Sequence, residues 1–280
     1  MPVELLAVPQ HQGAVVVDGG RLPTGCAALA ELAGAALGRP PRVVAVASGT
    51  TPLTGGVASF SGLVANRWAQ LAVLRRVREP VLLVGGDCGV ETAALAVARA
   101  RWGDGLGVVW WDAHADLNTP GSSPSAAFHG MALRAALGEG DPALVADPPV
   151  VAGQVVLAGV RALDPDERAV IAEGLVTHLG PDLARDPGRV AAALVGSGAS
   201  HAYLHVDLDV LDPDEFGGAC CPEPGGLTVD EVVAGIEAVA AALPVVGVGV
   251  TECVTTDPVE LRRIMPILEA AHAALARWSD

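Results

Sequence analysis

The segment from Trp110 to Asn118 contains the densest set of side chains that could carry out chemistry. Asp112, His114 and Asp116 occupy every second position after the apolar run Leu106–Trp111. Side chains of an extended chain alternate between two faces, so we expect these three to point the same way from the end of a buried strand. Two carboxylates and an imidazole in one small space favour a divalent metal such as manganese. For this segment alone, a polar strand end with aspartate as a turn or cap residue is the alternative.

Polar residues follow three other apolar runs, in each case at the carboxyl end of the run. The segments are Gly85-Gly86-Asp87-Cys88, His205-Val206-Asp207-Leu208-Asp209 and Thr251-Glu252-Cys253. Parallel strands bring their carboxyl ends to one edge of a sheet, which is where ligands bind in open α/β sheets. Asp207 and Asp209 would then face the Asp112 set, and the convergence of these ends strengthens the prediction of a metal site.

The elements that must position these residues alternate short Val-rich runs with longer Ala-rich segments. The predicted strands are Val3–Val8, Arg42–Ala47, Val81–Val84, Leu106–Trp111, Gln154–Val160, Gly174–Leu179, Ala202–Leu208 and Val245–Val250. The predicted helices are Gly25–Leu37, Leu63–Arg78, Val90–Trp102, a short one from His129 to Leu137, one capped by Thr228 that ends near Leu243, and Pro258–Arg277. This order predicts an α/β fold, in which residues 1–280 form a single three-layer α/β/α domain with an eight-stranded, mostly parallel sheet. The loop Leu117–Phe128 is long enough to suggest a function.

Composition argues against several classes of protein. The formal net charge of −15 disfavours a nucleic-acid partner, because phosphate binding needs clustered basic residues. No apolar run reaches the roughly eighteen residues of a membrane-spanning helix, and the first residues lack the basic region and cleavage site of a signal peptide. We therefore expect a cytoplasmic protein with no membrane partner. The five cysteines do not form a disulfide framework in a chain of 280 residues, so we expect reduced thiols.

The motif set resembles that of the ureohydrolase family, which contains arginase, agmatinase and formiminoglutamase. The similar motifs are Gly-Gly-Asp at 85–87, Asp-Ala-His-Ala-Asp-Leu-Asn at 112–118, His-Gly at 129–130, Val-Asp-Leu-Asp-Val-Leu-Asp-Pro at 206–213 and Thr-Glu at 251–252. They occur in the family's order over nearly the whole chain. The resemblance implies an arginase-like fold and hydrolysis of a guanidino C–N bond.

By this resemblance the chain would bind two Mn²⁺ ions. Asp112 and Asp207 would bridge the ions, Asp116 would complete one site, and His114 and Asp209 would complete the other. A hydroxide held between the ions would attack the guanidinium carbon, because two cations lower the pKa of a shared water and stabilise the tetrahedral intermediate.

The resemblance also gives catalytic roles to His129 and Glu252, in addition to Asp116. His129 would shuttle protons to the departing amine. Glu252 would receive the guanidinium group through a charge-assisted hydrogen bond. A surface histidine at a helix start is the alternative for His129.

Four further residues match or neighbour positions that bind substrate in arginases. Asn118 and Ser125 match positions that hold an α-carboxylate. Asp164, with Glu167 nearby, matches an acid that binds an α-amino group, although Asp164 could instead cap the helix that follows it. Because agmatine has no carboxylate, these residues favour a small guanidino amino acid as substrate.

Two cysteines depart from the arginase pattern. Cys88 stands where arginases have a metal-ligand histidine, and Cys221 stands beside the guanidinium pocket where a threonine is usual. Manganese prefers nitrogen and oxygen donors to a soft thiolate, so one metal site should be weaker or differently arranged. Cys88 could ligate as a thiolate, leave its position to water, or be a packed apolar residue.

Both departures concern the reacting end of the substrate. The Cys-for-His variant resembles the branch of the family that hydrolyses Nω-hydroxy-L-arginine to hydroxyurea and L-ornithine in the biosynthesis of the antibiotic D-cycloserine. This activity is our leading hypothesis. The alternatives are an ordinary arginase, which makes urea and ornithine, and a non-catalytic arginase-like binder in which the change at Cys88 is damage.

The remaining histidines have no predicted role in the site. His11, His178, His201 and His272 lack partners at ligand spacing, and His205 occupies a position at which family members vary. The sequence is compatible with a monomer and with a homo-oligomer.

Overall fold

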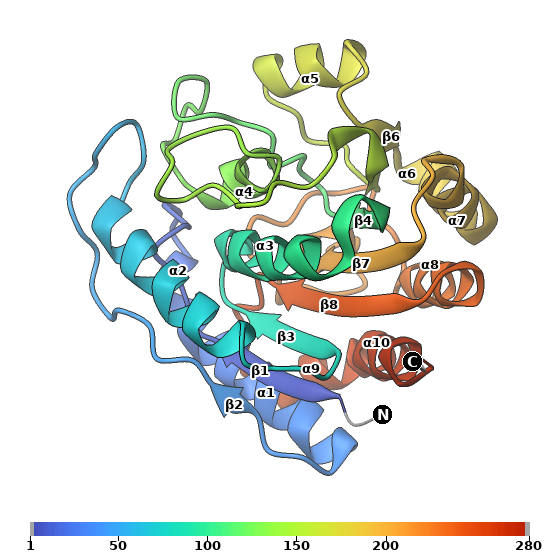
Figure 1. The fold of residues 1–280 in the computed structure, drawn as a ribbon. Coiled ribbons are helices and arrows are strands. Elements are labelled where there is room, and N and C mark those ends of the chain that lie inside the picture. Colours follow the sequence, from blue (N-terminus) through green and yellow to red (C-terminus); the bar gives the residue numbers. More distant parts are fainter. Residues whose placement is uncertain (1–2, 278–280) are drawn as a thin grey trace.

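The centre of the fold is one eight-stranded sheet, which the computed structural model shows within residues 3–277 (Figure 1). The strands are β1 (Glu4–Val8), β2 (Arg42–Val43), β3 (Val81–Gly85), β4 (Leu106–Trp111), β5 (Val155–Ala158), β6 (Thr177–Leu179), β7 (His201–Asp207) and β8 (Val245–Thr251). Their order across the sheet is β2-β1-β3-β8-β7-β4-β5-β6, and all neighbouring strands are parallel. The predicted fold class is confirmed.

Helices cover both faces of the sheet and give three layers (Figure 1). They are α1 (Leu22–Leu37), α2 (Phe60–Leu74), α3 (Glu91–Trp102), α4 (Ala132–Ala136), α5 (Pro165–Ala172), α6 (Pro181–Ala184), α7 (Pro187–Gly196), α8 (Val229–Ala242), α9 (Pro258–Arg263) and α10 (Met265–Ala276). One core lies between the sheet and helices α1, α7, α8 and α10. The other core lies between the opposite face and helices α2, α3 and α4.

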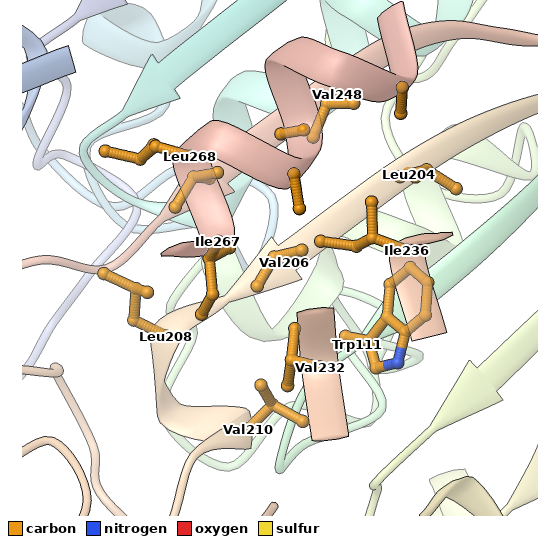
Figure 2. Packing of buried hydrophobic residues seen from close by; sticks show 14 of the residues in the cluster. Trp111, Leu204, Val206, Leu208, Val210, Val232, Ile236, Val248, Ile267 and Leu268 are labelled. Carbon is orange, nitrogen blue, oxygen red and sulfur yellow. The ribbon is translucent and has the colours of Figure 1, made fainter. Parts of the chain in front are cut away.

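Successive side chains of a strand point to opposite faces of the sheet, so each strand contributes residues to both cores. On β7, Leu204 and Val206 enter the core under α8 and α10, whereas Tyr203 enters the core on the α3 side. Figure 2 shows Leu204 and Val206 beside Ile236 of α8 and Ile267 of α10. Burial of one such aliphatic side chain stabilises the fold by about 1.5–3 kcal/mol. The sheet is therefore a firmly packed support for whatever follows its strand ends.

The strand order brings the four polar strand ends together. β3, β8, β7 and β4 are consecutive in the sheet, and these are the strands followed by acidic, histidine or cysteine residues. The sequence indicates which strand ends are polar. It does not indicate that these strands are neighbours, because their order across the sheet, β3-β8-β7-β4, differs from their order in the sequence. The candidate site lies over the middle of the sheet.

Several predicted boundaries are wrong. β2 has only two residues. The predicted helix Pro258–Arg277 is divided at Ile264 into α9 and α10, because Pro266 in the first turn of α10 has no N–H with which to continue a helix. The predicted helices do not include α6 and α7, and α5 is anticipated only as the helix that Asp164 could cap. A proline in the first turn marks the start of each of the three.

Two local predictions are confirmed. Thr228 caps α8: its Oγ1 accepts a hydrogen bond from the Glu231 N–H (3.2 Å), and a Glu231 carboxylate oxygen accepts one from the Thr228 N–H (2.9 Å). The segment Leu117–Phe128 contains no helix or strand.

Within the described residues, no helix has the length and apolar character that a membrane crossing requires.

Candidate active site

The segment after β4 turns away from the strand direction. β4 ends at Trp111, so the prediction that Asp112, His114 and Asp116 alternate along an extended chain is wrong. Asp112 Oδ1 accepts a hydrogen bond from the His114 backbone N–H (2.6 Å), which closes a tight turn. Asp116 follows with a positive φ of 52°. A turn, rather than strand alternation, positions the three side chains.

The end of β7 is tied to this turn by hydrogen bonds. Asp207 Oδ1 accepts from the Asp209 N–H (2.7 Å) at the start of the 3-10 turn Leu208–Val210. Asp209 Oδ1 accepts from the Ala113 N–H (2.9 Å), and Asp209 Oδ2 lies 2.9 Å from His114 Nδ1. The two polar strand ends therefore form one unit.

Two groups of side chains have the spacing of metal ligands. The inner group is Cys88, Asp112, His205 and Asp207, and the outer group is Asp112, His114 and Asp209. Within each group the candidate ligand atoms lie within 4.8 Å of one another. Asp112 belongs to both groups, so two ions bound here would share its carboxylate.

The carboxylates of this region fit a two-metal centre. Asp112, Asp116, Asp207 and Asp209 are each at most 5% exposed. Burial and then the charge of a neighbouring carboxylate raise the pKa of Asp112, Asp116 and Asp207. Asp116 Oδ2 is buried and has no hydrogen-bond partner among the described residues. Such crowding is relieved by cations, and carboxylate and imidazole donors suit Mn²⁺.

His114 links protonation to metal binding at the outer group. Burial acts to lower the pKa of His114, but its hydrogen bonds with Asp112 and Asp209 and their charges raise that pKa to about 12. A metal-ligating imidazole is neutral. An ion held by the outer group would therefore displace a proton from His114.

Cys88 lies at the start of the 3-10 turn Cys88–Val90, which follows β3. Its buried Sγ is 3.0 Å from Asp207 Oδ2, 3.1 Å from Thr251 Oγ1 and 3.6 Å from His205 Nε2. Burial, followed by the charges of the carboxylates around it, raises the pKa of the Cys88 thiol well above its ordinary value. A thiolate at this position therefore requires a cation beside it.

Glu252 connects the inner group to His129. Its Oε1 accepts a hydrogen bond from the Cys88 N–H (2.9 Å) and lies 3.2 Å from His129 Nδ1. Its Oε2 is buried and has no partner among residues 3–277, so it can accept a hydrogen bond from a ligand. Burial acts to lower the pKa of His129, but the charge and hydrogen bond of Glu252 raise that pKa to about 9. His129 therefore holds a proton at neutral pH.

One cavity of about 140 Å³ joins these residues to those predicted to bind substrate. All predicted site residues line it except Cys88 and Asp112, which are fully buried. The predicted residues that line it are His114, Asp116, Asn118, Ser125, His129, Asp164, Glu167, Asp207, Asp209, Cys221 and Glu252. Asp116 is in neither ligand group and reaches the cavity directly.

Asn118 and Asp164 form a second polar set in this cavity. Asn118 Nδ2 donates to Asp164 Oδ2 (2.8 Å), and Ser122 Oγ donates to Asn118 Oδ1 (2.9 Å). Glu167 accepts from the N–H groups of Leu117 and Asp164, both at 2.9 Å, and so ties the loop after β4 to the start of α5. Asp164 is also the residue that precedes α5 at its cap position.

The arginase family model matches residues 46–259. The chain belongs to the arginase family. An arginase of Bacillus caldovelox is 38% identical over 179 residues, which cover 61% of this chain and 59% of that protein. An arginase of Bacillus subtilis is 37% identical over 158 residues, which cover 54% of this chain and 53% of that protein. The sequence alignments thus span little more than half the length of these two relatives.

Solved arginase structures match over nearly the whole chain. The native arginase of Bacillus caldovelox superposes with a TM-score of 0.84 at 25% identity, covering 99% of both chains. The arginase of Entamoeba histolytica in complex with L-ornithine superposes with a TM-score of 0.86 at 20% identity, covering 96% of this chain and 97% of that one. At 20% identity, the similarity to the Entamoeba histolytica arginase shows a shared fold.

Three residues of this arginase-family site have left-handed backbone conformations. They are Asp116 (φ 52°), Cys221 (φ 54°) and Glu252 (φ 65°). A non-glycine residue held in such a region costs about 1–3 kcal/mol and persists only where its surroundings impose it. Their occurrence in one cavity indicates that the site is built under strain.

Cys221 enters the cavity from the loop before α8. Its Sγ lies 3.9 Å from Cys220 Sγ, and the hydrogen bond from that thiol lowers the pKa of Cys221. Cys220 is buried, whereas Cys221 is partly exposed. Of this pair, Cys221 is therefore the thiol that a ligand can contact.

His205 belongs to a ligand group of this arginase-family site, although the sequence alone predicts no role for it. It is fully buried and belongs to the inner group. The signal was its position two residues before Asp207 on β7, because residues two apart on a strand share a face.

Proposed function

We propose that this chain hydrolyses the guanidino C–N bond of Nω-hydroxy-L-arginine to give hydroxyurea and L-ornithine, with two Mn²⁺ ions and residues 1–280 acting as one catalytic domain. The observation that carries the proposal is the single cavity, which joins two ligand groups for metal to side chains suited to a guanidinium group and to an amino acid. The solved Entamoeba histolytica arginase with L-ornithine has the same fold.

The inner and outer groups would hold the ions, with Asp112 shared between them and Asp207 beside both. When bound, the two ions would supply a water of lowered pKa as nucleophile and would stabilise charge in the transition state. Asp116 lines the cavity, and its Oδ2 has no hydrogen-bond partner in the described part of the chain, so it would complete the oxygen ligands.

Glu252 and His129 act on the guanidinium end of the substrate. Glu252 Oε2 accepts a hydrogen bond from the guanidinium N–H, because this oxygen is buried and has no other partner among residues 3–277. His129 holds a proton up to about pH 9 and lines the same cavity, so it can protonate the departing amine. Their contact of 3.2 Å couples binding to proton transfer.

Asn118, Ser125 and Asp164 recognise the amino-acid end. Asn118 and Ser125 present an amide and a hydroxyl, which can donate to an α-carboxylate. Asp164 can accept from an α-ammonium group, and its hydrogen bond with Asn118 fixes the two side chains relative to each other. Glu167 holds the loop in place through its two backbone contacts.

The choice of the hydroxylated substrate rests on Cys88 and Cys221. A hydroxyguanidine is less basic than a guanidine and has an additional oxygen. The changed metal-ligand position, Cys88, and the changed pocket residue, Cys221, both lie at the end of the site that would bind this group. Ordinary arginase activity is the second candidate, because the curated relatives that match this chain are named arginases.

The test is release of L-ornithine from Nω-hydroxy-L-arginine, L-arginine and agmatine by the Mn²⁺-loaded protein. We expect the highest kcat/KM for the hydroxylated substrate and negligible turnover of agmatine, which has no carboxylate for Asn118. His129→Asn is the inactive control, and His201→Gln, a change near the other end of β7, is the control that should retain activity. A higher kcat/KM for L-arginine would replace the proposed substrate, and no turnover of any of the three would overturn the proposed function.

A further inference from the structure

His205 lies on the face of β7 that looks toward α3. Strand alternation places Tyr203, His205 and Asp207 on this face. Helix α3 packs over β7, β8 and β4 on the same side (Figure 1). Asp207 belongs to the inner group, and His205, two residues earlier on the same face of β7, belongs to it as well.

The imidazole of His205 is fixed against Trp110. The two rings stack with centroids 3.6 Å apart and an interplanar angle of 23°. Trp110 Nε1 also donates to Asp112 Oδ2 (2.9 Å), so one tryptophan orients both a shared carboxylate and this histidine. His205 Nε2 is 3.6 Å from Cys88 Sγ. A ring nitrogen of His205 also lies within 4.8 Å of the candidate ligand atoms of Cys88, Asp112 and Asp207.

The other ring nitrogen of His205 faces a buried carboxylate. His205 Nδ1 lies 3.5 Å from Glu91 Oε1, and both side chains are 0% exposed. Tyr203 Oη donates to the second oxygen, Glu91 Oε2, at 2.6 Å. Metal-ligating histidines characteristically present one nitrogen to the ion and donate the other N–H to a carboxylate, which fixes the tautomer.

Two glycines of β8 make room for this arrangement. In the strand register Gly247 pairs with Tyr203, and Gly249 pairs with His205. A Cβ at Gly249 would lie 3.0 Å or less from three atoms of the Glu91 carboxyl group, and one at Gly247 would be 2.5 Å from the Tyr203 ring. The Val-Gly-Val-Gly-Val pattern of β8 therefore leaves space for the acid that faces the histidine.

A packed core histidine is the simpler explanation of His205. A buried imidazole of that kind is expected to have both nitrogens in ordinary hydrogen bonds, because an unpaired buried polar atom is costly. Among residues 3–277, Nδ1 has no partner of hydrogen-bond geometry, and Nε2 has only the Cys88 thiol at 3.6 Å. The ring is aimed at the inner group but is not satisfied by it.

We propose that His205 ligates the inner metal ion through Nε2 and that Glu91, itself held by Tyr203, positions the ring. The inner ion would then have an imidazole from β7 in addition to the Cys88 position. The inference rests on the metal centre of the proposed function and is independent of which guanidino compound is hydrolysed.

The test measures metal binding instead of turnover. Metal-free parent, His205→Gln, Glu91→Gln and the matched control His201→Gln are equilibrated with Mn²⁺, and bound metal is counted by mass spectrometry across a range of free Mn²⁺. Thermal unfolding of each metal-free protein reports whether it is folded. We expect two ions in the parent and in His201→Gln, and inner-ion affinity lower by at least about 10-fold in His205→Gln and by about 10–100-fold in Glu91→Gln.

Glu91→Gln keeps the shape of the side chain and reports on positioning even if His205→Gln does not fold. Pulsed EPR of bound Mn²⁺ adds a direct readout, because loss of His205 should remove one imidazole nitrogen coupling. Parent-like affinity and unchanged nitrogen coupling in a folded His205→Gln, or parent-like affinity in Glu91→Gln, overturn the assignment. Fewer than two ions in the parent would overturn the metal centre itself, and with it this proposal.

Discussion

Replacement of Cys88 by histidine tests how the inner group is packed. By sequence alone this change should restore the ligand that arginases carry and should improve metal retention. In the structure, Cys88 Sγ already lies 3.0 Å from Asp207, 3.1 Å from Thr251 and 3.6 Å from the His205 ring. An imidazole at position 88 would occupy the space that His205 occupies, so we expect Cys88→His alone to be destabilising.

The expected magnitude follows from the cost of overpacking. Extra atoms in a filled core cost about 1–3 kcal/mol, and in a chain of this size that corresponds to a fall in Tm of roughly 2–10 °C. In the double variant Cys88→His/His205→Ser the second change removes the competing ring. We expect a favourable coupling energy of about 1–3 kcal/mol between the two substitutions.

The assay is a double-mutant cycle on thermal unfolding of the metal-free proteins, with Mn²⁺ stoichiometry measured on the same samples. Cys88→Ser is the matched control, because it removes the thiol without adding volume. We expect the double variant to regain the inner ion that Cys88→His loses. A stable Cys88→His that binds Mn²⁺ more tightly than the parent, with no coupling to His205→Ser, would refute this reasoning.

Three further outcomes follow from the cavity. Glu252→Gln should lower kcat/KM by roughly 10–100-fold, because a charge-assisted hydrogen bond is worth about 1.5–3 kcal/mol, and should shift the alkaline limb of the pH–rate profile to lower pH; an unchanged profile would show that Glu252 does not control His129. The pKa of His129 is raised to about 9, so its proton is present below that pH. We therefore expect kcat to decline as pH rises through about 9. The His129→Asn variant should lose this alkaline decline and should have a kcat lower by roughly 10²–10⁴-fold. Iodoacetamide should modify Cys221 before the four buried cysteines, and this modification should block turnover unless substrate occupies the cavity. If iodoacetamide also inactivates the Cys221→Ser variant, the reactive thiol lies elsewhere.

Much of the fold could be predicted from local sequence signals. Val-rich runs mark the strands, and the capping pair of Thr228 and Glu231 marks the start of α8. The polar ends of four strands indicate where the chemistry lies, because parallel strands end at one edge. Asp207 at the end of β7 and Glu252 just after β8 line the cavity as that rule predicts. Asn118, Ser125 and Cys221 line the same cavity from loops, and the rule does not predict their positions.

What the sequence did not indicate depends on contacts between distant elements. Glu91 and His205 are 114 positions apart in the sequence. His205 can have a role only because the folded chain places Glu91, at the start of α3, beside β7. The turn after β4 could not be derived from alternation, because Asp112 bonds to the backbone of His114 and ends the extended segment. Strand neighbours, and the free space left by Gly249, are properties of the packed structure.

The most direct test of the central proposal is a comparison of kcat/KM for Nω-hydroxy-L-arginine and L-arginine, measured on one preparation that contains two Mn²⁺ ions per chain. We predict a clear preference for the hydroxylated substrate, with hydroxyurea and L-ornithine formed in equal amounts. A preference for L-arginine, with urea as the product, would contradict the proposal.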